Sequence, residues 1–169
     1  MGLVETVLKG TSRWCALALR LVLAVLMVGM VYVLGRQVFT RYVLGFSEYW
    51  TEELARYFLI WMVFLGGALA VREGAHLSMG LAVMHLRGRT AGVVRRAKDV
   101  CVAAFAAIML TAGASYVQVA MEQRTPVTQI PMSWIYLPIP LAGAMILLFL
   151  AEEAVCGPPP PAARPAEAE

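Results

Sequence analysis

The chain has little charge, and four long stretches of it have none. Only 15% of its 169 residues are Asp, Glu, Lys or Arg, and none of these lies in residues 21–35, 57–71, 100–121 or 125–151. An ionised side chain at the centre of a bilayer costs roughly 2.5 to 3.5 kcal/mol on insertion scales. Charge-free stretches of this length therefore indicate an integral membrane protein, with little chain left over for a soluble domain.

Cysteine and histidine are also scarce, which argues against two classes of membrane enzyme. Cys15, Cys101 and Cys156 are far apart and form no CxxC motif, so the chain lacks the paired thiols of a thiol-oxidising membrane enzyme. We interpret all three as small apolar residues. A haem-bearing anchor needs histidine ligands within its spans. The two histidines, His76 and His85, instead share one connection outside the expected spans.

Acidic groups at mid-membrane depth are missing as well. Transporters of ions or acids usually rely on buried polar groups or broken helices there, and no Asp, Glu, Lys or His lies in the middle of an expected span. We infer that the chain carries no charged solute alone and supports another protein that does. Two alternatives stay open: an autonomous small four-helix transporter or exporter, and a membrane anchor subunit of a respiratory enzyme.

The apolar residues predict an all-α membrane protein with four transmembrane helices. They make up 60% of the chain, with a mean hydropathy of +0.72, against about 45–50% apolar in soluble domains. We expect spans over residues 14–34, 54–71, 100–121 and 131–150. The first is too long for a signal-peptide core, so we expect it to be retained. Residues 1–156 then form one membrane domain, and the Pro-rich residues 157–169 form a disordered tail.

The basic residues predict the orientation of these spans. With both termini in the cytoplasm, 10 of the 14 Lys and Arg residues lie inside and 4 lie outside, as the positive-inside rule requires. The cytoplasmic connection between the second and third spans then carries Arg72, His76, Arg95 and Arg96, which we expect to meet lipid headgroups. Arg20, inside the first span, is expected to reach the headgroups along its own helix. The net charge of +3, spread beside the apolar runs, does not indicate binding to nucleic acid.

The segment before the second span predicts a short helical extension. Ser47 is suited to cap a helix, and Glu52 and Arg56 have the favourable i,i+4 spacing of an ion pair. Aromatic and apolar side chains recur at spacings of 4, 3, 4 and 3, which places one stripe on a helix face: Trp50, Leu54, Tyr57, Trp61 and Phe64. Two interpretations stay open, because an apolar stripe in lipid identifies no partner. It is either an interfacial aromatic belt or a docking face for another membrane helix.

Small residues and prolines predict how the spans pack. Gly66-Gly67 with Ala70, and Ala103 with Ala107, would let helices approach closely, although such residues are also generally common in membrane helices. Pro138 and Pro140 remove hydrogen bonds inside the fourth span and should bend it. Such a bend lines a substrate path in some proteins and only shapes packing in others.

Taken in order, several of these segments resemble a known family. Over about residues 21–148 the chain is similar to the small permease subunit, called DctQ-like, of tripartite ATP-independent periplasmic (TRAP) transporters. The resemblance rests on Arg36-Gln37-Val38-Phe39 with Arg41-Tyr42, on Trp50-Thr51-Glu52-Glu53-Leu54-Ala55-Arg56, on Trp61 with Phe64-Leu65-Gly66, on Gly74 with His76, and on Ile130-Pro131 with Trp134 and Pro138.

The resemblance implies a non-catalytic subunit of the bacterial or archaeal cytoplasmic (inner) membrane. In that family a larger membrane subunit holds the substrate site and the coupling-ion sites, usually for sodium, and a periplasmic binding protein delivers an organic acid. The small subunit is similar to a scaffold and holds no cofactor or metal itself. The resemblance does not identify the acid.

These implications give two sets of candidate residues. The first is a hypothetical subunit interface on the helix that begins before the second span: Trp50, Glu52, Glu53, Arg56, Trp61, Phe64 and Gly66. The second is a hypothetical periplasmic edge: Arg36, Arg41, Pro131 and Trp134.

Overall fold

The computed structural model describes residues 3–46, 48–74 and 89–156, nearly all of them helical. The elements are α1 (Leu3–Tyr42), α2 (Tyr49–Gly74), α4 (Arg89–Val119), the 3-10 helix η1 (Ala120–Glu122), α5 (Met132–Tyr136) and α6 (Pro138–Cys156). Four segments are long and apolar enough to cross a membrane: Leu8–Tyr42, Tyr49–Glu73, Arg96–Glu122 and Met132–Val155. The predicted all-α, four-span fold is therefore confirmed for the described residues.

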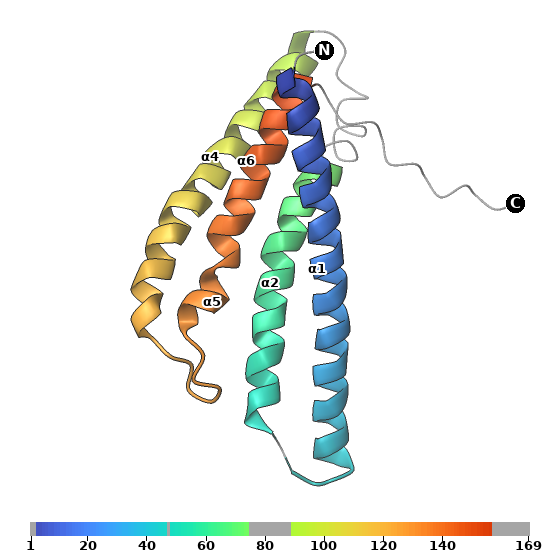
Figure 1. The fold of residues 1–169 in the computed structure, drawn as a ribbon, viewed down its shortest axis with the longest axis vertical. Coiled ribbons are helices and arrows are strands. Elements are labelled where there is room, and N and C mark those ends of the chain that lie inside the picture. The colour runs from blue at the N-terminus through green and yellow to red at the C-terminus, as the bar shows by residue number, and fades with distance from the viewer. Residues whose placement is uncertain (1–2, 47, 75–88, 157–169) are drawn as a thin grey trace, which may run out of the picture.

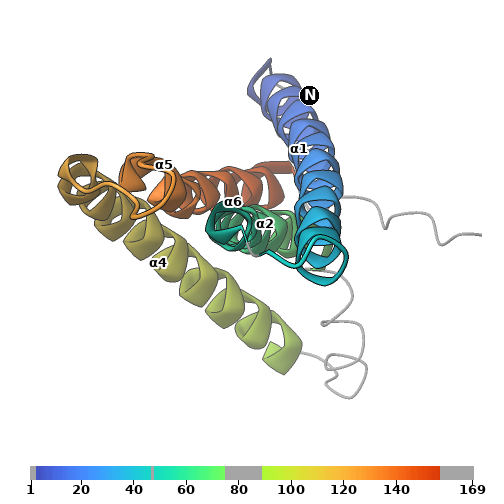
Figure 2. The same ribbon diagram turned by 90° about the horizontal axis from the view of Figure 1, so that it is seen from below.

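The helices run alternately up and down (Figure 1). The start of α1, the end of α2, the start of α4 and the end of α6 lie at one end of the bundle, which we call the termini end. Residues 43–46 and the connection 123–131 lie at the opposite end, which we call the loop end. Toward the loop end the α1–α2 pair diverges from the α4–α5–α6 group in both views (Figures 1 and 2).

Helices α2 and α6 are the central pair, and α1 and α4 lie on the outside. Helix α1 packs on α2 and α6, while α4 packs mainly on α6 (Figure 2). One core cluster joins α1, α2 and α6 around Leu65 and Phe149. A second cluster joins α2, α4 and α6 through three alanines with no exposed surface: Ala68, Ala106 and Ala142.

Close approach between helices occurs mainly at positions other than the predicted ones. At Gly143 of α6 an added Cβ would lie 2.7 Å from the carbonyl oxygen of Ala106 in α4. At Gly113 of α4 it would lie 3.0 Å from Pro140. By contrast, a Cβ at Gly67 would meet nothing within 4 Å, and one at Gly66 only the side chain of Leu23, at 3.9 Å.

The observed helices extend beyond the predicted spans. At 1.5 Å per residue the 40 residues of α1 measure about 60 Å, roughly twice the hydrocarbon thickness. Helix α1 ends at Tyr42 and is followed by a left-handed glycine, Gly45 (φ 73°), after which the Phe46 N–H donates to the carbonyl of Thr40 at 3.3 Å. The predicted short extension before the second span is part of α2 itself, which begins at Tyr49 and runs without a break.

The prolines interrupt the fourth span, as predicted. Helix α5 ends at Tyr136 and α6 begins at Pro138, with Leu137 between them. Pro131, in extended conformation (φ −58°, ψ 130°), precedes the first turn of α5. The expectations for Ser47, His76 and the tail 157–169 lie outside the described residues.

Candidate functional site

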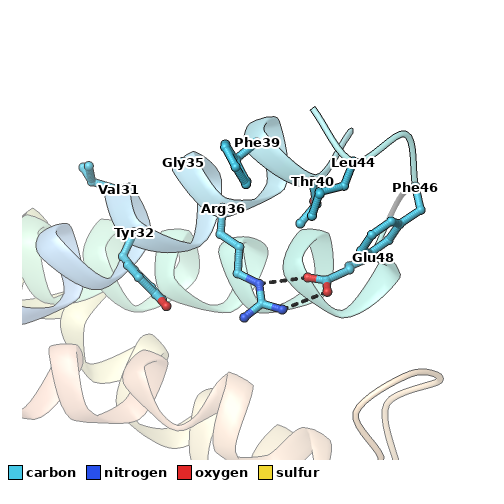
Figure 3. A pocket seen from close by; sticks show the side chains of 9 residues that line it. All are labelled: Val31, Tyr32, Gly35, Arg36, Phe39, Thr40, Leu44, Phe46 and Glu48. Carbon is cyan, nitrogen blue, oxygen red and sulfur yellow. Dashed lines mark hydrogen bonds and ion pairs between the residues drawn. The ribbon is translucent and has the colours of Figure 1, made fainter. Parts of the chain in front are cut away.

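An ion pair between α1 and the start of α2 lies at the loop end. Arg36 donates from Nε to one Glu48 oxygen at 3.0 Å and from Nη2 to the other at 2.8 Å. Figure 3 shows the guanidinium reaching across from α1 to this carboxylate. The Arg36 Cζ also lies 5.1 Å from the centroid of the Trp50 ring, within the range of a cation–π contact. The structure thus brings together Arg36 of the predicted periplasmic edge and Trp50 of the predicted subunit interface.

Glu52 and Arg56 do not form the expected ion pair. Glu52 instead accepts a hydrogen bond from the side chain of Gln37 at 3.2 Å, which links α2 to α1. Arg56 is exposed and has no hydrogen bond or ion pair to any other described residue. Arg41, at the end of α1, is also exposed and also has no hydrogen bond or ion pair to another described residue. Helix α2 therefore presents an unpaired cation about two turns from the loop end.

Glu53 lies inside the protein and holds a distant loop. It is 8% exposed, and its carboxylate accepts hydrogen bonds from the Tyr57 hydroxyl and, at 2.9 Å, from the backbone N–H of Thr128. Thr128 lies 75 residues further along the chain, in the connection before α5. This contact could not be predicted from the acidic residue alone, because no local pattern relates α2 to a loop 75 residues away.

The connection 123–131 is closed by its own hydrogen bonds. Thr125 donates its N–H to the carbonyl of Ile130 at 3.0 Å, and the N–H of Met132 donates to the carbonyl of Gln123 at 2.9 Å. Arg124 Nη1 caps the loop by donating to the carbonyl of Gln129 at 3.1 Å, and Gln129 has a positive φ of 55°. A non-glycine residue in this region is held there by its surroundings.

The remaining residues of the predicted interface face other helices of the same chain. Trp61 packs against the first core cluster and donates its indole N–H to the carbonyl of Trp134 at 3.2 Å. Phe64 packs against the second cluster, and Gly66 faces Leu23 of α1. These placements follow from the central position of α2. The indole of Trp134, at the predicted periplasmic edge, is exposed.

A second polar cluster lies at the termini end. Glu152 of α6 is buried and accepts a hydrogen bond from the Ser12 hydroxyl of α1. Arg72 of α2 donates from Nη1 to the carbonyl of Ser12 at 2.6 Å, and its Nη2 lies 3.6 Å from Glu152. Its Cζ lies 5.0 Å from the centroid of Phe149. We expected Arg72 to meet lipid headgroups, but it lies between α1, α2 and α6 and contacts residues of α1 and α6.

The other cations expected at this end have different surroundings. Arg20 forms an ion pair with Glu73 of α2, with Nη2 at 2.6 Å from the carboxylate, although both side chains stay about half exposed. The expectation that Arg20 simply reaches the headgroups was therefore incomplete. Arg96 is exposed on α4, and the side chain of Arg95 is outside the described part. Within the described ranges no group of three or more metal-ligating side chains occurs.

The outer helices expose large apolar side chains along their length. On α1 they recur at spacings of 7, 4, 3 and 4: Trp14, Leu21, Val25, Val28 and Tyr32. On α4 they include Val100, Phe105, Ile108, Tyr116 and Val119. The surface that is free for lipid or for another protein therefore lies mainly on α1 and α4.

Comparisons with known proteins agree with this architecture. A family model described as "Tripartite ATP-independent periplasmic transporters, DctQ component" matches residues 30–157, more than half of the chain. A Haemophilus influenzae protein named as a TRAP transporter small permease is 25% identical over 100 residues, which is 59% of this chain and 62% of that protein. The isethionate TRAP transporter permease protein DctMQ of Oleidesulfovibrio alaskensis is 25% identical over 135 residues, 75% of this chain and 21% of that protein. The match therefore spans less than two thirds of the length of either relative.

Proposed function

This chain belongs to the DctQ component family of tripartite ATP-independent periplasmic (TRAP) transporters, and on that premise we propose that it is the scaffold of its transporter. As a DctQ component it is a small membrane subunit of a transporter and not an enzyme. In the proposed role it supports a larger membrane subunit that carries out the ion-coupled uptake of an organic acid. A periplasmic binding protein delivers that acid.

The observation that carries the scaffold role is the way both ends of the bundle are tied together. At the termini end, Arg72 and Glu152 join α1, α2 and α6. At the loop end, Arg36 joins α1 to Glu48, and Glu53 joins α2 to the loop before α5. Ion pairs and hydrogen bonds of this kind oppose sliding of one helix past another. A rigid bundle suits a subunit that stays stationary while its partner moves.

The exposed surfaces support a membrane partner. The apolar faces of α1 and α4 and the unpaired Arg56 of α2 are available for contact. An arginine within a span usually finds a polar partner, so Arg56 is the cation that we expect to meet an acidic or carbonyl group of the large subunit. The similarity to one part of a longer permease named DctMQ supports a partner that is fused to this component in that protein.

In this proposal the large partner subunit binds the transported acid and the coupling ion. Sodium is the ion that we expect there, and this chain holds no cofactor. We place the protein in the cytoplasmic membrane of a bacterium or archaeon, with the termini end in the cytoplasm. Arg41 and Trp134 then lie at the periplasmic edge, where the binding protein would dock.

Affinity purification of the tagged full chain from native membranes tests the proposal. We expect a multi-helix membrane protein to co-purify in constant ratio, and we expect liposomes that hold this chain alone to accumulate no acid under a sodium gradient. Gradient-driven accumulation by the chain alone would contradict the scaffold role and favour an autonomous carrier.

Arg56 offers a residue-level test of the interface. Arg56→Ala should lower the yield of the co-purified partner by up to about fivefold, since it removes an ion pair or charged hydrogen bond worth up to about 1 kcal/mol at a partly exposed site. Arg13→Ala, which changes an equally exposed arginine at the other end of the bundle, should leave the yield unchanged. Equal yields in the two variants would exclude Arg56 from the interface.

A further inference from the structure

A surface groove lies between the loop-end half of α1 and the connection to α2. Its volume is about 570 Å³, it is widely open to the outside, and Figure 3 shows the side chains that line it. The walls are mostly apolar, from Val31, Phe39, Leu44 and Phe46. Gly35 forms part of the floor, and an added Cβ there would meet no atom within 4 Å. The groove is therefore a shallow hollow on the outside of α1, with open space above Gly35.

The polar groups of the groove are one cation and one anion side by side. Arg36 uses Nε and Nη2 for Glu48, and its third nitrogen, Nη1, lies outside this pair. Each Glu48 oxygen accepts one of these bonds and can accept another. The hydroxyl of Tyr32 lies on the same side of the groove as the guanidinium (Figure 3). The pair has no net charge, yet it offers a donor and an acceptor a few ångströms apart.

The position of the groove indicates what reaches it. It lies at the loop end of α1, which is a membrane span, on a surface of exposed apolar side chains such as Val28, Val31 and Phe39. Polar groups near the end of a span lie at the depth of the lipid headgroups. A molecule bound there must combine an apolar chain, for the face of α1, with a polar head for the ion pair.

We propose that this groove binds the headgroup of a zwitterionic phospholipid of the surrounding bilayer. The phosphate accepts hydrogen bonds from Nη1 of Arg36, and the ammonium of the headgroup donates to the Glu48 carboxylate. One acyl chain lies along the face of α1 that begins at Val31. An anionic headgroup without an amine would satisfy Arg36 but place its charge beside Glu48, so the neutral ion pair favours the zwitterion. This proposal does not depend on a partner subunit.

Native mass spectrometry of the delipidated full chain in detergent tests it. The probes are dioleoyl phosphatidylethanolamine and dioleoyl phosphatidylglycerol, which share their acyl chains and differ in the headgroup, and soluble phosphoethanolamine, which has no chains. We expect the first lipid to bind about fivefold more tightly than the second, a ratio typical of one exposed charged contact. Soluble phosphoethanolamine should show no binding at the same concentration.

Two matched pairs of variants assign the binding to the groove. Gly35→Leu places a side chain in the open space of the groove, keeps both charged residues, and should reduce the binding of phosphatidylethanolamine about fivefold. Gly10→Leu, at another position of α1 where a Cβ meets nothing within 4 Å, should not. Glu48→Gln, which removes the negative charge that receives the ammonium, should remove the preference between the two lipids. Glu73→Gln, which breaks the more exposed ion pair of α2 with Arg20 outside the groove, should retain it.

Three results would overturn the proposal. The first is equal affinity for the two lipids in the unchanged protein. The second is unaltered binding in Gly35→Leu, because the recess would then be irrelevant. The third is binding of soluble phosphoethanolamine as strong as that of the lipid, which would make the groove a site for a free phosphate compound.

Discussion

Replacing Glu53 should release the loop at residues 123–131 while the helices stay assembled. The carboxylate holds two donors, the Tyr57 hydroxyl and the Thr128 N–H. Glu53→Ala leaves both without an acceptor, which costs about 1–3 kcal/mol for a fully buried group, and these two donors are partly buried. The loop end also meets water, which can replace part of the lost contact. We therefore take the low end of that range, about 2 kcal/mol in total.

Hydrogen exchange of the loop amides measures this cost directly. Since about 1.4 kcal/mol corresponds to a factor of ten, the Thr128 amide should exchange about 30-fold faster in Glu53→Ala than in the unchanged protein. Glu53→Gln keeps one acceptor oxygen and should accelerate exchange only about fivefold, equivalent to about 1 kcal/mol. Mass spectrometry of peptides that cover the loop, in detergent or nanodiscs, gives both rates.

Glu52→Ala is the matched control for this experiment. Glu52 is the neighbouring carboxylate, but it is exposed and contacts Gln37 of α1 instead of the loop. Its removal should leave exchange at Thr128 within about twofold of the unchanged protein, as expected for a surface contact. If both alanine variants exchanged at the same rate, Glu53 would not be what holds the loop, and the reasoning from its burial would fail.

Two further predictions concern helix packing and topology. Gly143→Ala places a Cβ 2.7 Å from a backbone oxygen of α4 and should destabilise the protein by about 1–3 kcal/mol. In Gly67→Ala the added Cβ meets nothing within 4 Å, so this variant should be neutral or slightly stabilising. Thermal unfolding in detergent compares the two variants, and equal melting temperatures would contradict the close packing at Gly143. In a background without native cysteines, Val43→Cys and Val127→Cys should react with an impermeant thiol reagent added outside intact cells, and Gly10→Cys should react only after the membrane is opened. The reverse pattern would invert the proposed orientation.

The number and order of the membrane spans could be predicted because these features are local. A charge-free run indicates a membrane span without reference to the rest of the chain, and a proline lacks the N–H that a helix hydrogen bond at its position requires. The interruption at Leu137 was predictable on this basis. The limits of the helices were harder to predict, because α1 continues through Arg20 and Arg36, and each of these arginines is paired with a carboxylate outside its own helix.

The partners of the charged residues could not be predicted, because helix packing brings them together. Ser12 and Glu152 are 140 residues apart, and Arg20 and Glu73 are 53 apart. A pattern within one helix indicates which side chains share a face but not which neighbour that face meets. The i,i+4 spacing of Glu52 and Arg56 was a local signal, yet Gln37 of α1 is the partner of Glu52 in the folded protein.

The aromatic stripe on α2 illustrates the same limit for the candidate interface. A stripe in a membrane helix is compatible with lipid, with a partner subunit and with another helix of the same chain. Because α2 is central in the bundle, Trp61 and Phe64 pack against other helices of the same chain. The surface left for a larger subunit is therefore that of α1 and α4, together with Arg56. Substitutions on these surfaces are the ones that can separate assembly of the transporter from folding of this subunit, since buried positions of α2 would change both.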